Sequence, residues 1–200
     1  MGTSMTDPVT APATTGATTA ARQDQYRLAV IIGSVREGRF ATTVGDWFVR
    51  QAGRRDDVKL DAIDLAAPDA GGTGFGERID AADAVVIVVP EYNHSFPGAL
   101  KTAIDSLKPQ WQAKPIGFVS YGGRGGGLRA VEQLRLVFAE LHATTIRETV
   151  SFHDAWQAFG PDGEPVQARE AVQAATALLD QLAWWALALR RAREEAPYPV

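Results

Sequence analysis

The run Ala84 to Val89, which Pro90 ends, is the feature that most restricts the fold of this chain. Six successive apolar residues, most of them β-branched, favour a strand that is covered on both faces. A second apolar run, Leu28 to Ile32, ends at Gly33 in a similar way. Strands buried on both faces are typical of a parallel sheet with helices on either side.

The remaining segments alternate between helical and strand patterns. Further strands are expected over 58–65, 115–120 and 144–152. Helices are expected over 40–52, 77–82, 97–107, 128–141 and 166–193. Strand and helix thus alternate five times. This predicts an α/β, flavodoxin-like, doubly wound sheet of five parallel strands in the order 2-1-3-4-5, with helices on both faces.

At 200 residues the chain has the length of one ordinary domain, which we expect over 25–193. Residues 1–24 are rich in Thr and Ala and poor in core-forming side chains, so a disordered N-terminal tail is expected there. They lack the charged start and apolar block of a signal peptide. Residues 194–200 are expected to form a C-terminal tail.

Composition excludes several classes of function. The chain has no cysteine, which rules out disulfides, thiolate catalysis and Cys-ligated metals and fits a reducing cytoplasm, where we expect the protein. Its net charge is −4 with both signs mixed, so no nucleic-acid partner is expected. It has no run of about eighteen apolar residues, so we expect no membrane partner either.

The loop over 33–42 follows the first strand and is predicted to bind a phosphate. A loop between a buried strand and a helix offers free backbone N–H groups and the positive end of the helix dipole, and both favour an anion. Ser34 and Thr42 add hydroxyl groups, and Arg36 and Arg39 add positive charge. This set suits a terminal phosphate, although the loop is neither GxxxxGK[ST] nor GxGxxG. The alternative is a capped helix start with surface arginines.

The loop Pro90 to Gly98 follows the third strand and carries two aromatics, an Asn, a His and a Ser. Such a composition after a buried strand indicates a ligand. Tyr92 or Phe96 is expected near a planar ring, with backbone N–H groups at its polar edge. We interpret His94 as a packing or hydrogen-bonding residue rather than a general base.

The loop from Ser120 to Gly127, after the fourth strand, contains five glycines. Glycine lets the backbone approach a ligand closely and adopt positive φ. We therefore favour a ligand-binding loop over a merely flexible connection. Carboxyl ends of parallel strands form the ligand-binding edge of such sheets, so the three loops should meet there.

Metal and hydrolase sites have little support in the sequence. His94, His142 and His153 are far apart and form no HxxxH or HExxH pair, so no metal is expected. Neither Ser34 nor Ser120 lies in a GxSxG elbow, which argues against hydrolase chemistry.

From about Arg27 to His153 the chain resembles the NADPH-dependent FMN reductases, a family that includes quinone, chromate and azo-compound reductases. The most specific part is 90–105, which is similar nearly residue for residue to the family's flavin loop and following helix, with Thr102 where Asn is commoner. Gly33-Ser34-x-Arg36 is similar to the family's phosphate loop. Gly126-Gly127-x-Arg129-Ala130, followed by Leu134-Arg135, is similar to the helix after its third loop.

The resemblance implies bound FMN, with NADPH or NADH as co-substrate and a quinone, flavin, azo or metal-oxyanion acceptor. Ser34 and Arg36 would hold the phosphate, residues 90–95 would wrap the isoalloxazine largely through backbone groups, and residues 120–123 would close the other side. No catalytic side chain is expected, because the flavin carries the hydride chemistry. The expected cofactor-binding residues are Ser34, Arg36, Arg39, Phe40, Thr42, Pro90, Glu91, Tyr92, Asn93, His94, Ser95, Ser120, Tyr121, Gly122 and Gly123.

One departure from the family lies in the first loop. Arg39 and Ala41 stand near positions where many members have Ser and Asn. The guanidinium of Arg39 suits a phosphate, so we interpret Arg39 as compensating for the missing Ser and Asn.

The resemblance also implies a homodimer or homotetramer, with the helix after the flavin loop at the interface. Lys101 and Asp105 are i,i+4 on that helix and form either part of this interface or a plain surface pair. Trp184-Trp185 in the last helix is interpreted as core or interface rather than a ligand contact.

Two rivals to a reductase are a flavodoxin-type electron carrier and a flavin-binding module without turnover. Such carriers bind phosphate through a Ser/Thr-rich loop, whereas this loop has two arginines.

Overall fold

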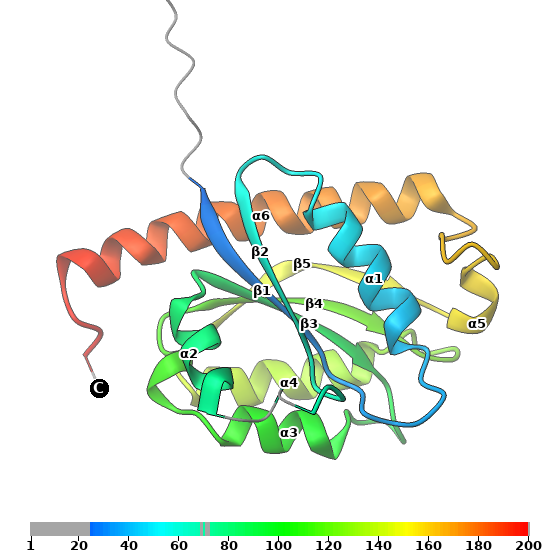
Figure 1. Cartoon of the computed structure of the whole chain (residues 1–200), viewed down its shortest axis with the longest axis horizontal. Helices are drawn as coiled ribbons and strands as arrows, with labels where there is room; N and C mark the ends of the chain where they lie inside the picture. The colour runs from blue at the N-terminus through cyan, green and yellow to red at the C-terminus, as the bar shows by residue number, and fades with distance from the viewer. Residues whose placement is uncertain (1–24, 69, 71–72, 200) are drawn as a thin grey trace, which may run out of the picture.

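The sheet has the predicted strand order. The computed structural model describes residues 25–68, 70 and 73–199, so the expected N-terminal tail over 1–24 lies outside the described residues. Five parallel strands pair in the order β2-β1-β3-β4-β5 (Figure 1). They are β1 (Tyr26–Ile32), β2 (Val58–Asp64), β3 (Ala84–Pro90), β4 (Pro115–Tyr121) and β5 (Thr144–Phe152).

Burial along the strands follows their positions in the sheet. Every residue of β3 and β4 is buried, and β1 exposes only Arg27. The edge strand β2 buries only Ile63. The apolar runs are therefore the central strands, as their composition predicted.

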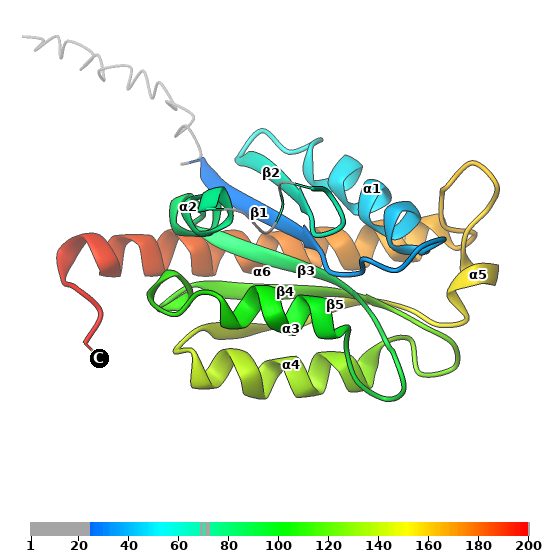
Figure 2. The same cartoon turned by 60° about the horizontal axis from the view of Figure 1, so that its bottom comes forward.

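Helices cover both faces of the sheet (Figures 1 and 2). One face packs against α1 (Ala41–Ala52) and α6 (Ala168–Glu195), and the other against α2 (Thr73–Ala81), α3 (Gly98–Asp105) and α4 (Leu128–Glu140). Among the described residues, no helix is long and apolar enough to cross a bilayer.

Two short helices and one helix start differ from the sequence-based expectation. The 3₁₀ helix η1 (Pro109–Trp111) and α5 (Ala155–Ala158) are too short to give a periodic pattern. Helix α2 begins at Thr73, four residues before the expected start. The sequence predicted a later start because Gly74 and Gly76 are typical of a loop rather than a helix.

The two adjacent tryptophans of α6, Trp184 and Trp185, lie in different environments. Trp185 is partly buried and packs against the core on the α1 and α6 face. Trp184 is 65% exposed. The expected core role therefore fits Trp185, and an interface role for Trp184 stays a prediction.

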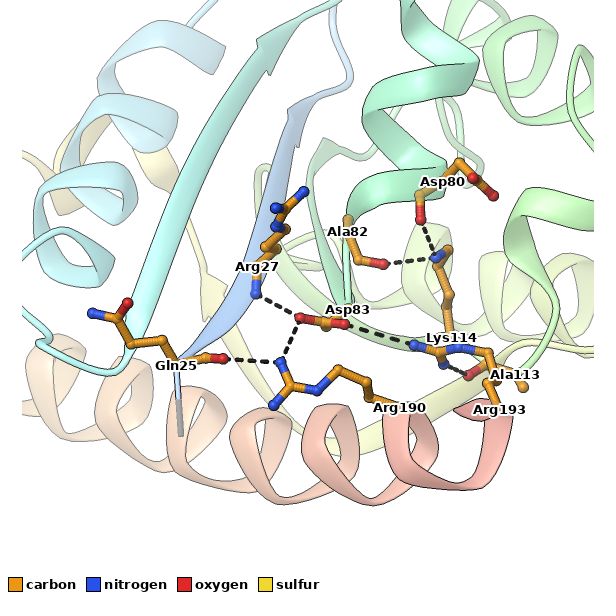
Figure 3. A network of polar contacts seen from close by, with 9 residues as sticks. All are labelled: Gln25, Arg27, Asp80, Ala82, Asp83, Ala113, Lys114, Arg190 and Arg193. Atoms are coloured by element: carbon orange, nitrogen blue, oxygen red, sulfur yellow. Dashed lines mark hydrogen bonds and ion pairs between the residues drawn. The ribbon is translucent and has the colours of Figure 1, made fainter. Parts of the chain in front are cut away.

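A carboxylate at the amino edge of the sheet fastens α6 to the strands (Figure 3). Asp83, just before β3, accepts hydrogen bonds from the backbone N–H of Arg27 (2.9 Å) and from Arg190 (3.2 Å). The guanidinium of Arg193 lies 3.8 Å from the same carboxylate. Because this edge is opposite the three loops, the network stabilises the fold without occupying the candidate site.

Lys114 belongs to the same edge and is buried. Its ammonium donates to the backbone carbonyls of Asp80 (3.1 Å) and Ala82 (2.6 Å) (Figure 3). Burial, and then the nearby charge of Arg193, lowers the pKa of Lys114 from 10.5 to about 8. Folding therefore opposes protonation of this side chain.

This shift predicts how stability depends on pH. Below pH 8 Lys114 is protonated in both states, but between about 8 and 10.5 the unfolded chain binds more protons, so stability rises with pH in that window. From pH 8 to pH 9.5 the free energy of unfolding of the wild type should rise by about 1–2 kcal/mol relative to that of Lys114→Met, because one pKa unit corresponds to about 1.4 kcal/mol. Urea unfolding at both pH values checks this, and a difference that stays constant or shrinks would contradict it.

Candidate active site

A cleft of about 590 Å³ opens at the carboxyl ends of β1, β3 and β4. The three loops expected to bind a ligand meet in its wall, as predicted for this edge of a doubly wound sheet. Its lining residues are Arg36, Glu37, Gly38, Arg39, Phe40, Pro90, Glu91, Tyr92, Asn93, Tyr121, Gly122 and Trp156.

The two arginines of the first loop have different surroundings. Arg39 donates to the backbone carbonyl of Ser34 (2.9 Å) and forms an ion pair with Asp64. Arg36 is exposed, and its side chain forms no hydrogen bond or ion pair with any described residue. The charge of Arg39 is thus largely compensated within the protein, whereas that of Arg36 is available to a ligand.

The start of α1 adds backbone donors beside Arg36. Phe40 precedes the helix, and no side chain caps the first turn. The first amides of a helix have no intrahelical acceptor, so those of Ala41, Thr42 and Thr43 are available to an anion. Thr42 is exposed but does not line the cleft.

Ser34 joins the first loop to the second instead of lining the cleft. Its fully buried hydroxyl forms a hydrogen bond of 2.7 Å with the Tyr92 hydroxyl. The structure therefore brings Arg36, Arg39 and Phe40 into the wall, while Ser34 fixes the position of Tyr92.

The second loop makes a tight turn. The backbones of Tyr92 and Ser95 exchange two hydrogen bonds of 2.9 Å, and Asn93 and His94 both have positive φ (50° and 66°). Positive φ at both central positions is the pattern of a type I′ turn. Gln133 of α4 binds the turn from outside, accepting from the Ser95 hydroxyl and donating to the His94 carbonyl, each at 2.7 Å.

This turn leaves part of the second loop outside the cleft. Residues 90–93 line the wall, whereas His94 and Ser95 do not. The Glu91 carboxylate pairs with Arg129 (2.8 Å) at the start of α4. Phe96 packs partly buried against the core, so Tyr92 is the aromatic of this loop that reaches the cleft.

The glycine-rich third loop is held by hydrogen bonds. The hydroxyls of Ser120 and Ser151 both donate to the carbonyl of Gly126 (2.8 Å each). The ring Nδ1 of His153 donates to the carbonyl of Arg124 (2.8 Å). Because three side chains fix this loop, the interpretation as a merely flexible connection is not supported.

Only part of the third loop faces the cleft. Tyr121 and Gly122 line it, whereas Ser120 and Gly123 do not. The phenol of Tyr121 is buried close to Ser34, Tyr92 and Arg39, and its hydroxyl makes no hydrogen bond of standard geometry with a described residue. Burial raises the pKa of Tyr121, so this phenol is neutral.

Sequence reasoning missed three residues of this region. Ser151 and His153 fix the third loop from the end of β5, and Trp156 of α5 lines the cleft. Their position in the sequence could have indicated them, because the end of β5 lies at the same carboxyl edge of the sheet as the three loops.

The unpaired groups of the cleft fit a phosphate-bearing, planar cofactor. Arg36 and the first amides of α1 are anion donors without a partner among the described residues, and the Tyr121 hydroxyl is a buried polar group that lacks one.

Residues 26–157 match the family model described as NADPH-dependent FMN reductase. The chain belongs to this family. The resemblance stated from the loop motifs is thereby confirmed.

Curated relatives agree with the family. The chain is 37% identical over 121 residues to an NAD(P)H-dependent FMN reductase of Schizosaccharomyces pombe, a match covering 50% of this chain and 60% of that protein, less than two thirds of its length. It is 33% identical over 134 residues to a quinone reductase of Pseudomonas putida, covering 58% of this chain and 72% of the relative.

Solved structures confirm the flavodoxin-like fold. The flavoenzyme NAD(P)H:(acceptor) oxidoreductase FerB from Paracoccus denitrificans superposes with a TM-score of 0.63 at 22% identity, covering 81% of this chain and 97% of that one. A flavodoxin variant from Pseudomonas aeruginosa gives 0.52 at 17% identity, covering 82% and 99%.

The placement of His94 in this FMN reductase family member predicts a modest kinetic effect. Its side chain is exposed and outside the cleft wall. His94→Asn removes the imidazole and keeps a residue that tolerates positive φ. For the flavin reductase activity proposed below, the rate of flavin reduction at saturating NADPH should therefore fall by less than about tenfold at full flavin occupancy. A loss beyond about a hundredfold would show that His94 transfers a proton, since a positioned acid or base contributes about that much or more.

Proposed function

We propose that this protein is an NAD(P)H-dependent oxidoreductase that binds FMN non-covalently in the cleft and reduces a small-molecule acceptor. The observation that carries the proposal is Arg36 beside the first amides of α1, none of which has a partner among the described residues, in a cleft completed by the second and third loops. Bound FMN would supply the chemistry, accepting a hydride from NAD(P)H and passing two electrons to the acceptor.

Arg36 and the first-turn amides of α1 would hold the phosphate. A guanidinium and helix N-terminal amides together offer charge-assisted hydrogen bonds to its oxygens. Arg39 would shape this subsite through its pair with Asp64 rather than neutralise the phosphate. Ser34 would act indirectly, by positioning Tyr92.

Backbone groups of the second loop would meet the polar edge of the flavin ring. The amides of Tyr92 and Ser95 are used within the turn, whereas those of Asn93 and His94 donate to no described residue. Fixed N–H groups stabilise negative charge that develops on a bound ring. Pro90, Tyr121 and Gly122 would contact the ring from the cleft wall.

Release of the chromophore by acid tests the identity of the cofactor. We expect FMN, because the first loop suits a terminal monophosphate and lacks the dinucleotide motif GxGxxG. Chromatography against FMN, FAD and riboflavin standards gives the answer. Release of FAD, or protein that neither retains nor rebinds any flavin, would contradict the proposal.

The proposed electron acceptors are quinones, free flavin, azo compounds or metal oxyanions. One relative is named quinone reductase and another, from Staphylococcus haemolyticus, FMN-dependent NADPH-azoreductase. Steady-state rates with a panel of these acceptors, each with NADPH and with NADH, would rank them. Uniformly negligible turnover with the whole panel would contradict a reductase of this kind.

We further propose a homodimer or homotetramer with α3 at an interface. The pair Lys101–Asp105 (2.6 Å) is partly exposed on α3, and the neighbouring helix α4 exposes Leu136. Light scattering of the wild type and of Leu136→Glu tests this. We expect an oligomer that the substitution weakens, and a monomeric wild type would contradict the proposal.

A further inference from the structure

Trp156 has an unusual place in the cleft wall. Its side chain is 67% exposed, whereas Phe40 and Tyr92 are partly buried and Tyr121 is buried. Among the described aromatic residues that line the cleft, it is therefore the one with the most surface available to a ligand. It also comes from α5, after β5, and not from the three loops.

Two backbone hydrogen bonds fix the start of α5. The amides of Asp154 and Ala155 donate to the carbonyls of Gly123 and Gly122, each at 2.9 Å. Both acceptors belong to the third loop, and the Ala155 side chain is fully buried. The residue before Trp156 thus packs into the protein, against the loop that closes the cleft.

Aromatic packing fixes the other end of α5. Phe159 is buried, and its ring centroid lies 4.7 Å from that of Phe152, 5.6 Å from Phe40 and 6.4 Å from Trp47. With Ala155 and Phe159 both anchored, the backbone that carries Trp156 is held between two fixed points. The indole is therefore presented at the cleft rim by a rigid support.

We infer that Trp156 is a specificity-determining residue that stacks on planar aromatic electron acceptors; this rests on the proposed function. A cofactor held by the three loops would lie against the buried wall, and the exposed rim is the surface that a second, exchanging ligand meets. An indole face is electron-rich and stacks well on flat, electron-poor rings such as quinones. A compact, non-planar acceptor gains nothing from it.

The test compares Trp156→Ala, Trp156→Phe and the wild type, with Trp184→Ala as a matched control on α6. Trp184 is similarly exposed (65%) and lies outside the cleft wall. The acceptors are menadione, a planar quinone, and ferricyanide, a compact anion. A stacked aromatic contributes about five- to tenfold in affinity. Trp156→Ala should therefore raise the KM for menadione by that factor and leave the KM for ferricyanide within about twofold. Trp156→Phe and Trp184→Ala should behave like the wild type.

A binding measurement complements the kinetics. Naphthoate, a planar ring that cannot be reduced, is titrated into the FMN-loaded, oxidised proteins and followed by the change in the flavin spectrum. Trp156→Ala should weaken naphthoate binding by a similar factor, and Trp184→Ala should not.

Three results would overturn the inference: an unchanged KM for menadione with unchanged naphthoate binding, an equal loss for menadione and ferricyanide, or a loss for NADPH alone. A wild type that binds FMN but is not reduced by NADPH would instead defeat the proposed function. The naphthoate titration would then still decide whether Trp156 stacks on planar rings.

Discussion

Gly127→Ala should destabilise the protein by about 2–5 kcal/mol and abolish tight FMN binding. Gly127 has a φ of 83°, and a Cβ there would lie 2.6 Å from the Ser120 Cβ and 2.7 Å from the Tyr121 backbone nitrogen. Left-handed backbone costs about 1–2 kcal/mol with a side chain, and overpacking adds about 1–3 kcal/mol. Relief of the clash requires movement of Tyr121, which lines the cleft.

Urea unfolding and a flavin fluorescence titration measure the two effects. Gly98→Ala at the start of α3 is the control, because a Cβ there meets nothing within 4 Å. It should leave stability unchanged or raise it slightly. If Gly127→Ala were as stable as the control and bound FMN normally, the third loop would not have the rigid conformation described above.

Arg36→Ala should weaken FMN binding by about ten- to a hundredfold and leave the fold intact. A hydrogen bond to a charged group contributes about 1.5–3 kcal/mol, which corresponds to that range of affinity. Folding should not suffer, because the Arg36 side chain is exposed and has no hydrogen bond or ion pair with a described residue. Flavin fluorescence titration and urea unfolding check the two parts.

Arg169→Ala provides a matched control for this substitution. Arg169 is also exposed, but it lies in the first turn of α6, outside the cleft. Its removal should change FMN affinity by less than about twofold, as is usual for an isolated surface charge. Unchanged FMN affinity in Arg36→Ala would return Arg36 to the alternative of a surface charge beside a helix start.

The order of the strands could be predicted because the central strands have a distinctive composition. The run Ala84–Val89 is buried on both faces, and a parallel sheet is the arrangement that buries such strands. Because helices alternate with these strands, and crossovers between parallel strands are right-handed, only a few strand orders remained for the sheet. Helix α5 escaped prediction because four residues give no periodicity.

The loops that form the site could also be predicted, but the work of each side chain could not. Ser34 and Arg39 are polar residues of the first loop, yet one binds the Tyr92 hydroxyl and the other pairs with Asp64. Both partners are distant in sequence: Tyr92 lies in the second loop and Asp64 in β2. Whether a polar group serves a ligand or the protein depends on such tertiary contacts, which no local pattern contains.

The same limit applies to Trp156. Its sequence neighbourhood gave no motif, and its position in the cleft follows from the hydrogen bonds between α5 and the third loop. The residue-for-residue likeness to the family's flavin loop covered only 90–105, and the wider resemblance ended at about His153, just before this residue.

Anaerobic stopped-flow mixing of the FMN-loaded protein with NADPH tests the central claim most directly. We expect the visible flavin absorbance to bleach completely, at a rate of at least about 1 per second, which is the lower end of ordinary enzyme turnover. Addition of a quinone should then restore the absorbance. Flavin that stays oxidised with both NADPH and NADH, while dithionite reduces it, would contradict a reductase and support an electron carrier or a flavin-binding module without turnover.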